Sequence, residues 1–343
     1  MSKQALIFDA ISADSIPMLE AAVAAGSSLS ALNPNQRSPA ACAAMSGQAL
    51  SLEWLLAHGA SLAPDCMGLT PLMLAARAGH ANCVRLLATR CDPNARSFNF
   101  EAGRSSSTAS RSGLCALEWA MEAGHPGPKL MECLSLLAPL SDAFSRDAVG
   151  RSLFFKAALS GSPACALMLM HATPEAAKDM CLEAGHSGDS PLLAAARSLL
   201  HAHPDIAAAN IQAMLSSAPA ANFPPSQRQA ALLMAIGAAC EDAARALLAV
   251  CDPRQACPET GSTPLMLAAE RGSTGCVKAI IEALGSDWRH AELLNFHGDS
   301  ACSASDPSIG SLIQTFICVE KEREAVAGAS EASPPSCPRP TRI

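Results

Sequence analysis

The stretch of sequence that decides the fold occurs twice in the chain. Residues 68–87 read GLTPLMLAARAGHANCVRLL, and residues 261–280 read GSTPLMLAAERGSTGCVKAI. In the first copy, Thr70 can cap a helix whose first turn contains Pro71, a residue that loses nothing there by lacking an amide hydrogen. Gly79 ends this helix, and a second helix with apolar residues at helical spacing follows. Two copies of one helix–turn–helix plan indicate a chain built from repeated units.

Small and aliphatic residues supply the core of such a unit. Leu72, Ala75 and Ala76 fall on one face of the first helix, and the second copy has the same residue types at the same places. The whole chain contains only 3% aromatic residues and no tyrosine, so Ala, Leu, Met and Cys must fill the interior. This composition favours many thin, closely packed helices over one large core.

Both stretches resemble the ankyrin repeat, whose pattern is G-x-T-P-L-H-x-A-A-x-x-G-H-x-x-x-V-x-x-L-L. The sequence departs from this pattern where Met73 and Met266 replace the usual histidine. The Thr–His hydrogen bond typical of the family is therefore expected to be missing, which would weaken individual repeats slightly. In the same frame, weaker copies occupy residues 38–62, 113–137, 150–170, 188–215 and 229–254, with partial copies at 4–32 and 295–317.

The resemblance implies an all-α fold, a solenoid of about eight to nine helix–turn–helix units with hairpin-like loops, over residues 1–319. Insertions near 97–112 and 201–223 interrupt the rhythm of about 33 residues per repeat. The first insertion is rich in serine, and the second is rich in alanine and expected to be helical. After Val319 the charge, serine and proline content cannot form a core, so residues 320–343 are expected to be a disordered tail.

Charge and composition argue against several classes of partner. The net charge of −7 provides no basic field for a phosphate backbone, so we expect no nucleic-acid partner. No apolar run approaches the roughly 18 to 20 residues that span a bilayer, so we expect no membrane insertion. Asp9, Asp14 and Glu20 interrupt the N-terminal segment, which is unlike a secretory signal. The fifteen cysteines are odd in number and include no C-x-x-C pair, which indicates free thiols in a reducing cytoplasm.

Three patterns could carry chemistry, and the repeat frame explains each of them better. Residues 185–191 (GHSGDSP) echo hydrolase and serine-protease motifs, but Asp189 and Pro191 stand where those motifs require glycine. His201 and His203 form an H-x-H pair without further metal ligands at usable spacing. We therefore expect no catalytic residue, no metal site and no cofactor. Cysteines that recur on helix faces are expected to pack in the core, namely Cys83, Cys133, Cys165, Cys240 and Cys276.

Ankyrin repeat proteins bind partners on a concave face made of loop tips and the first helix of each unit, so the resemblance implies that this chain binds another protein there. Arg and Met, which anchor interfaces well, occur among the corresponding positions. The expected contacts in loop tips are Met67, Leu69, Arg111, Leu114, Glu259 and Ser262. The expected contacts on first helices are Met45, Ser46, Arg77, Ala78, Glu122, Arg197, Glu270 and Arg271.

These observations together predict a non-enzymatic interaction module or scaffold that acts in the cytoplasm as a monomer. Two alternatives stay open. One is a bacterial effector that is delivered into a host cell and engages a host protein through the array. The excess of Arg over Lys and the abundance of Ala, Gly and Pro, which resemble the products of a GC-rich genome, permit this alternative, and so does the polar tail. The other is an enzyme or metal site hidden in the insertions.

Overall fold

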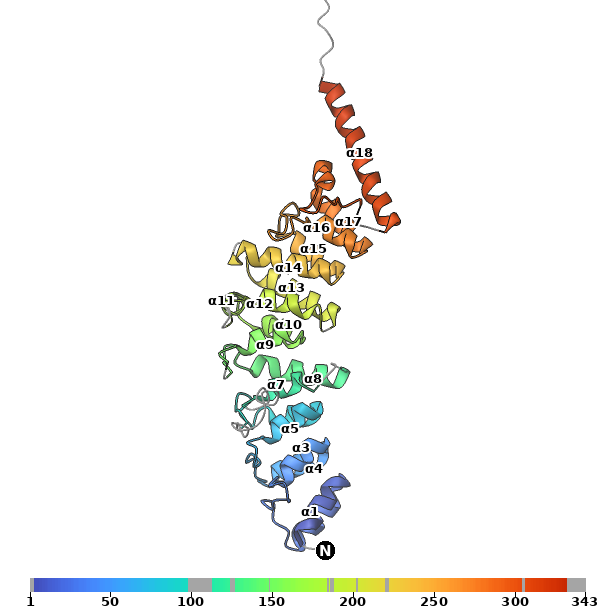
Figure 1. The fold of residues 1–343 in the computed structure, drawn as a ribbon. Helices are drawn as coiled ribbons and strands as arrows, with labels where there is room; N and C mark the ends of the chain where they lie inside the picture. Colours follow the sequence, from blue (N-terminus) through green and yellow to red (C-terminus); the bar gives the residue numbers. More distant parts are fainter. Residues whose placement is uncertain are drawn as a thin grey trace, which may run out of the picture.

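The chain folds into an elongated stack of helices. Figure 1 shows this computed structural model, with the N-terminus at one end of the stack and α18 at the other. The structure describes residues 3–97, 113–123, 127–147, 149–183, 185, 188–201, 203–219, 222–303 and 306–331. Within these ranges, β-pairing is limited to two isolated bridges, Arg146 with Ser152 and Leu294 with Ser300. The fold is all-α, as the sequence predicts.

Eight helix pairs form the array in the described residues, and we call the members of each pair the first and the second helix. The first helices are α1 (Lys3–Ser12), α3 (Pro39–Ser46), α5 (Pro71–Ala78), α7 (Ala116–Met121), α9 (Leu153–Leu159), α12 (Pro191–Ser198), α14 (Pro225–Gly237) and α16 (Pro264–Glu270). The second helices are α2 (Ile16–Ala24), α4 (Ala49–Ala57), α6 (Ala81–Leu87), α8 (Pro128–Leu137), α10 (Ala164–His171), α13 (Pro204–Ser217), α15 (Glu241–Leu248) and α17 (Thr274–Leu284). Outside the pairs lie η1 (Ala138–Leu140), α11 (Pro174–Leu182), η3 (Trp288–Glu292) and α18 (Pro307–Glu331).

The polar residue that precedes each Pro-Leu motif caps a first helix. Thr70 Oγ1 accepts a hydrogen bond from the Met73 N–H at 3.3 Å, and Thr263 Oγ1 accepts one from the Met266 N–H at 3.3 Å. These bonds satisfy amide groups that have no partner inside the helix. Gly79, with a φ of 73°, ends α5 in the left-handed conformation that glycine adopts without strain.

The two methionines that replace the family's histidine also contribute to the caps. Met73 Sδ accepts a hydrogen bond from the Thr70 N–H at 3.4 Å, and Met266 Sδ accepts one from the Thr263 N–H at the same distance. Thioether sulfur is a weak acceptor. The lost Thr–His hydrogen bond is therefore replaced in part by a weaker one, which the sequence analysis did not anticipate.

Alanine lets neighbouring first helices approach closely. Ala75 and Ala76 of α5 are fully buried, and so are their counterparts in α9, α12 and α16. The buried apolar residues form one continuous cluster along the array. Because each helix pair buries its apolar surface only against its neighbours, stability is set by nearest-neighbour interfaces.

The two segments that the sequence suggests as insertions have different outcomes in the structure. The alanine-rich one contains α13, so the helix expected within residues 201–223 is confirmed, but α13 is the regular second helix of its pair and not an addition to the repeat. The helix that lies outside the pairs in this region is α11. Most of the serine-rich one, residues 98–112, lies outside the described residues. Its two ends are joined, because the Ser97 N–H donates to Leu114 O at 3.1 Å and Ser97 Oγ accepts from the Leu114 N–H at 3.1 Å.

The C-terminal helix corrects the boundary that the sequence suggests. Residues 320–331 continue α18 as helix, where the sequence analysis expects a disordered tail. The physical reason is that KEREAVAGASE combines high charge with strong helix formers, and composition alone weighs only the charge. Residues 332–343, the rest of the expected tail, lie outside the described residues.

Contacts with η3 hold the middle of α18 in place. Lys321 Nζ lies 2.7 Å from Glu292 Oε1. Glu324 accepts hydrogen bonds from Trp288 Nε1 at 2.8 Å and from the Arg289 guanidinium at 2.6 Å. The preceding turns of α18 cover the last repeat with a buried apolar stripe made of Ile309, Ile313 and Ile317.

Candidate functional site

The hairpin-like loops end in turns that share one hydrogen-bond pattern, and we call these turns loop tips. In loop tip 65–69, Asp65 Oδ1 accepts hydrogen bonds from the N–H groups of Met67 at 2.9 Å and Leu69 at 3.0 Å. The Asp65 N–H donates to Leu69 O at 3.0 Å, and Gly68 turns the chain with a φ of 73°. These bonds hold the loop tip in one conformation. The same pattern of side-chain acceptor recurs at Asn33, Asp147 and Asn295.

A hollow lies between the loop tips and the first helices near the N-terminal end. It has a volume of about 640 Å³ and is lined by α1, α3 and Asn33 and Pro34 of loop tip 33–37. Its lining is mixed, with Phe8, Leu32 and Met45 among the apolar residues and Gln4 and Asp9 among the polar ones.

A second hollow, of about 430 Å³, occupies the corresponding place near the C-terminal end. Met266 and Glu270 of α16 form one wall, and His297 and Asp299 of the last loop tip form the other. The loop tips and the first helices therefore face a common surface at both ends of the array. We call this surface the groove.

Most of the predicted contact residues are accessible to a partner. Met45 and Ser46 line the N-terminal hollow, and Ser262 and Glu270 line the C-terminal one. Arg111 lies outside the described residues. The exposed predicted contacts are Met45, Ser46, Met67, Arg77, Ala78, Glu122, Arg197, Glu259, Glu270 and Arg271.

Two predicted contacts are wrong. Leu69 is 3% exposed and Leu114 is 2% exposed, so neither can touch a partner. Both directly precede the cap of a first helix, a position from which an apolar side chain packs back onto the helix. Leu74, the fourth residue after the cap Thr70, is the position on α5 onto which such a side chain packs, and it is buried as well. The prediction treated both leucines as part of an exposed loop tip and did not consider this packing.

Within the groove, two of the predicted arginines are already held in place. The Arg77 guanidinium lies over the Trp119 ring, with Cζ 5.0 Å from the ring centroid. Trp119 is only 8% exposed, so α7 supplies a fixed support for this cation. Arg197 Nη1 lies 2.6 Å from Asp189 Oδ2. The sequence analysis did not single out Trp119, although it occupies the frame position of Leu74.

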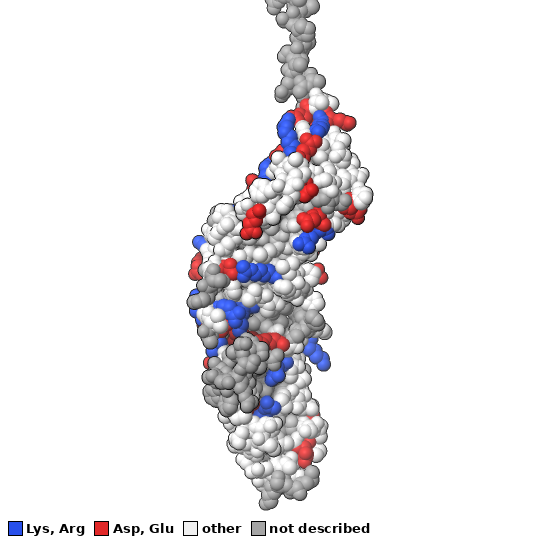
Figure 2. Space-filling view, in the orientation of Figure 1, with Lys and Arg blue, Asp and Glu red and all other residues white. Residues whose placement is uncertain are grey.

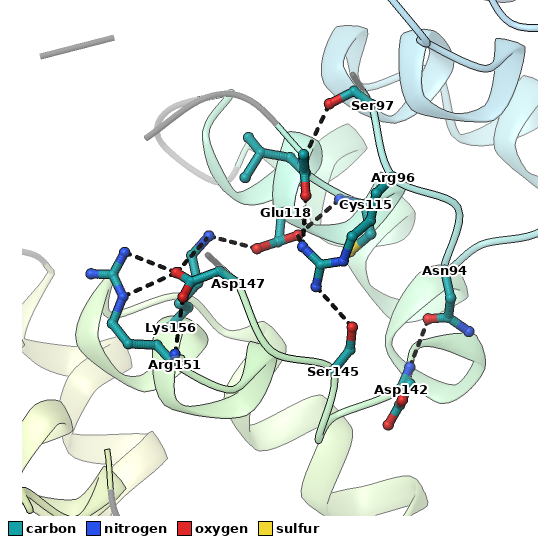
Figure 3. Close-up of polar contacts among 12 residues, drawn as sticks. Asn94, Arg96, Ser97, Cys115, Glu118, Asp142, Ser145, Asp147, Arg151 and Lys156 are labelled. Carbon is teal, nitrogen blue, oxygen red and sulfur yellow. Dashed lines mark hydrogen bonds and ion pairs between the residues drawn. The ribbon is translucent and has the colours of Figure 1, made fainter. Parts of the chain in front are cut away.

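A cluster of charged side chains lies where the groove crosses from α7 to α9, and Figure 3 shows it. Glu118 is 1% exposed, and its Oε1 lies 2.5 Å from Lys156 Nζ. Its Oε2 accepts a hydrogen bond from the Cys115 N–H at 2.8 Å and lies 3.5 Å from Arg96 Nη1. We call these residues, together with Asp147 and Arg151, the junction cluster.

The remaining members of the junction cluster connect loops to the helices. Asp147 Oδ2 accepts from the Arg151 guanidinium at 2.9–3.0 Å and lies 3.9 Å from Lys156 Nζ. Arg96 donates to Gly113 O at 2.6 Å and to Ser145 Oγ at 2.8 Å. Arg96 thus joins both ends of the serine-rich insertion to the next repeat.

Burial and neighbouring charges shift the pKa values of Asp147 and Cys115 at this junction. Burial alone would raise the pKa of Asp147, but hydrogen bonds from the Arg151 N–H and guanidinium and the charge of Arg151 lower it overall. Burial, together with the neighbouring Glu118 charge, raises the pKa of Cys115 to about 12. The junction cluster was not predicted from the sequence. Its signal was present, since Glu118 and Lys156 occupy frame positions that are apolar in α5 and α16.

The helix-face thiols lie mainly in the core. Cys83, Cys133, Cys165 and Cys276 are fully buried as predicted, whereas Cys240 is half-buried. Burial raises the pKa of Cys83 and of Cys133 to about 11 and that of Cys165 well above its ordinary value. Such thiols are poor nucleophiles at neutral pH.

In the part of the chain that the structure describes, no three His, Cys, Asp or Glu side chains gather closely enough to hold a metal ion. Of the described helices, none combines the length and apolar character needed to cross a membrane. Figure 2 shows one face of the molecule, where the N-terminal repeats are mostly uncharged and charges of both signs lie side by side near α18.

Comparison with known proteins agrees with the repeat frame. Residues 7–97 match a family model described as ankyrin repeats in three copies, and residues 260–291 match the model of a single ankyrin repeat. No curated protein matches the chain. The two matched regions include both copies of the stretch that decides the fold.

Proposed function

We propose that this chain, whose residues 7–97 and 260–291 match models of ankyrin repeats, binds another protein in the groove between its loop tips and its first helices. Ankyrin repeats are generally protein–protein interaction modules. The observation that carries the proposal is the pair of hollows that the loop tips and first helices share at the two ends of the groove.

Preorganised side chains along the groove support this proposal. Met45 and Met67 are exposed apolar residues on a first helix and on a hydrogen-bonded loop tip. Arg77 is supported by Trp119, and Arg197 is held by Asp189. Side chains that are already ordered lose little conformational freedom on binding, so more of the contact energy contributes to affinity.

The same features support a role without catalysis, in a reducing compartment. The described cysteines are free thiols, many of them buried with raised pKa values, which suits the cytoplasm and disfavours nucleophilic catalysis. We propose that the chain acts there as a monomer. The apolar stripe of α18, which includes Ile313, covers the last repeat and leaves that end without an open stacking surface.

Affinity capture with the intact chain, followed by titration of the recovered partner, tests this function. Arg77→Ala is expected to weaken binding about ten-fold, because an anchoring side chain contributes more than roughly 1 kcal/mol. The matched control is Arg85→Ala on the second helix α6, where Arg85 is exposed and pairs with Glu132. The control is expected to bind within about two-fold of the unmodified chain. Weakening by Arg85→Ala with no effect of Arg77→Ala would place the contact on the opposite face.

A further inference from the structure

One interface between first helices differs from all the others. Neighbouring first helices come close together along the described array, but α7 and α9 do so over fewer residues than any other adjacent pair. The first helix α5, by contrast, packs closely against α7 and carries fully buried small residues such as Ala75 and Ala76. Between α7 and α9 lie the long side chains of Glu118 and Lys156.

Polar contacts take the place of close packing between the two first helices, while α8 and η1 keep apolar contact with α10. Lys156 Nζ reaches Glu118 Oε1 at 2.5 Å, and Arg96 reaches Ser145 Oγ at 2.8 Å. On the loop side, Asn94 Oδ1 accepts a hydrogen bond from the Asp142 N–H at 2.8 Å. At the matching frame positions, α5 has Met73 and Leu74, and α16 has a methionine and a leucine as well.

Polar and apolar interfaces differ in what opening them costs. Separating an apolar interface exposes hydrocarbon to water, and no favourable hydration compensates for the free energy that this costs. Separating an ion pair returns hydration to both charges, which offsets much of the Coulomb attraction that is lost. In a solenoid, where stability is a sum of nearest-neighbour terms, the interface with the smallest net term opens first.

We propose that the array consists of two cooperative units, α1–α8 and α9–α18, which separate first at the Glu118–Lys156 interface. Each unit carries one of the two hollows of the groove, so opening at this interface changes how the two hollows are placed relative to each other. Arg96 contacts both Gly113 and Ser145, and therefore links the ends of the serine-rich insertion to the same interface. This proposal does not depend on the identity of any partner.

Native-state hydrogen exchange of the full chain, followed peptide by peptide at increasing urea, tests the proposal. In the unmodified chain, the two units are expected to lose protection at different urea concentrations. Between those concentrations, the amides of one unit are expected to have protection factors at least about ten-fold lower than those of the other. The double variant Glu118→Met/Lys156→Leu gives each position the residue type that α5 and α16 have there. In this variant the two units are expected to lose protection together.

A matched control separates the interface from ion pairs in general. Arg245→Met removes an exposed cation that bridges α15 and α17 through Glu241 and Glu282. This variant is expected to keep the division into two units. Loss of protection at one urea concentration throughout the unmodified chain would overturn the proposal, even if a variant failed to fold. So would a double variant that still divides between α8 and α9.

Discussion

The interface between α5 and α7 and the interface between α7 and α9 lie one repeat apart, yet they are stabilised differently. The first buries small apolar residues such as Ala75 and Ala76. The second buries the ion pair of Glu118 with Lys156 and is connected by polar contacts to the loops on either side. The same repeat frame can therefore be filled with hydrocarbon or with charge. The two interfaces differ in how strongly their stability depends on the identity of the contacting side chain. A buried charge is stable only beside an opposite charge, whereas a methyl group can be packed by any apolar group of suitable size.

Removing one charge from the junction cluster should have the largest effect on stability. Lys156→Met leaves the buried Glu118 carboxylate with Arg96 at 3.5 Å as its nearest remaining cation. We expect a loss of about 3 kcal/mol in the free energy of unfolding, measured by urea titration at pH 7. Arg245→Met, at an exposed ion pair, should leave stability unchanged. A loss below about 1 kcal/mol for Lys156→Met would show that the ion pair contributes little beyond its surroundings.

Overfilling an apolar interface should have the next largest effect. Ala268 of α16 is fully buried in a helix that packs against α14 and α17, so Ala268→Phe must displace packed neighbours. We expect a loss of about 1–3 kcal/mol in the free energy of unfolding. Ala78→Phe, at an exposed position on α5, is the matched control and should change stability little. Equal losses from the two substitutions would mean that helix propensity, and not packing, sets the cost.

The smallest effect expected is a dependence on pH at the junction cluster. Because the folded pKa of Asp147 lies below its ordinary value of 3.8, its stabilising contribution is present above that value. The contribution is lost as the pH falls through the lower, folded pKa, when the carboxylate no longer holds Arg151 and Lys156. Urea titrations between pH 5 and pH 2.5 should show a smaller acid-induced loss for Asp147→Asn than for the unmodified chain. The same loss in both would assign the acid sensitivity to other carboxylates.

The paired helices of the repeats could be predicted from the sequence because the residues that mark them lie close together in the chain. Thr70, Pro71 and Gly79 mark the start and end of one helix within ten residues, and the structure keeps these roles. The alanine pairs predicted close helix packing for the same reason. The capping signals act within one turn of the chain, so they can be read without knowledge of the tertiary contacts.

The parts that were missed depend on contacts between distant residues. The pairing of Glu118 with Lys156 joins the first helices of two successive pairs, and only alignment of the repeat frames would show two charges at apolar positions. Leu69 and Leu114 were placed in the groove because loop tips were taken as uniformly exposed, although their apolar side chains can pack inward. The extension of α18 past residue 320 combines strong helix formers with contacts to Trp288 and its neighbours, and a count of charged, serine and proline residues records neither.

The central claim is that the groove is the binding surface, and hydrogen exchange of the chain with and without its captured partner tests it most directly. The account predicts that binding slows exchange in loop tips such as 65–69 and at the C-terminal ends of first helices, around Arg77 and Glu270. Exchange in the second helices α6 and α15 should stay unchanged. Protection confined to the second helices, with the loop tips unaffected, would contradict the account.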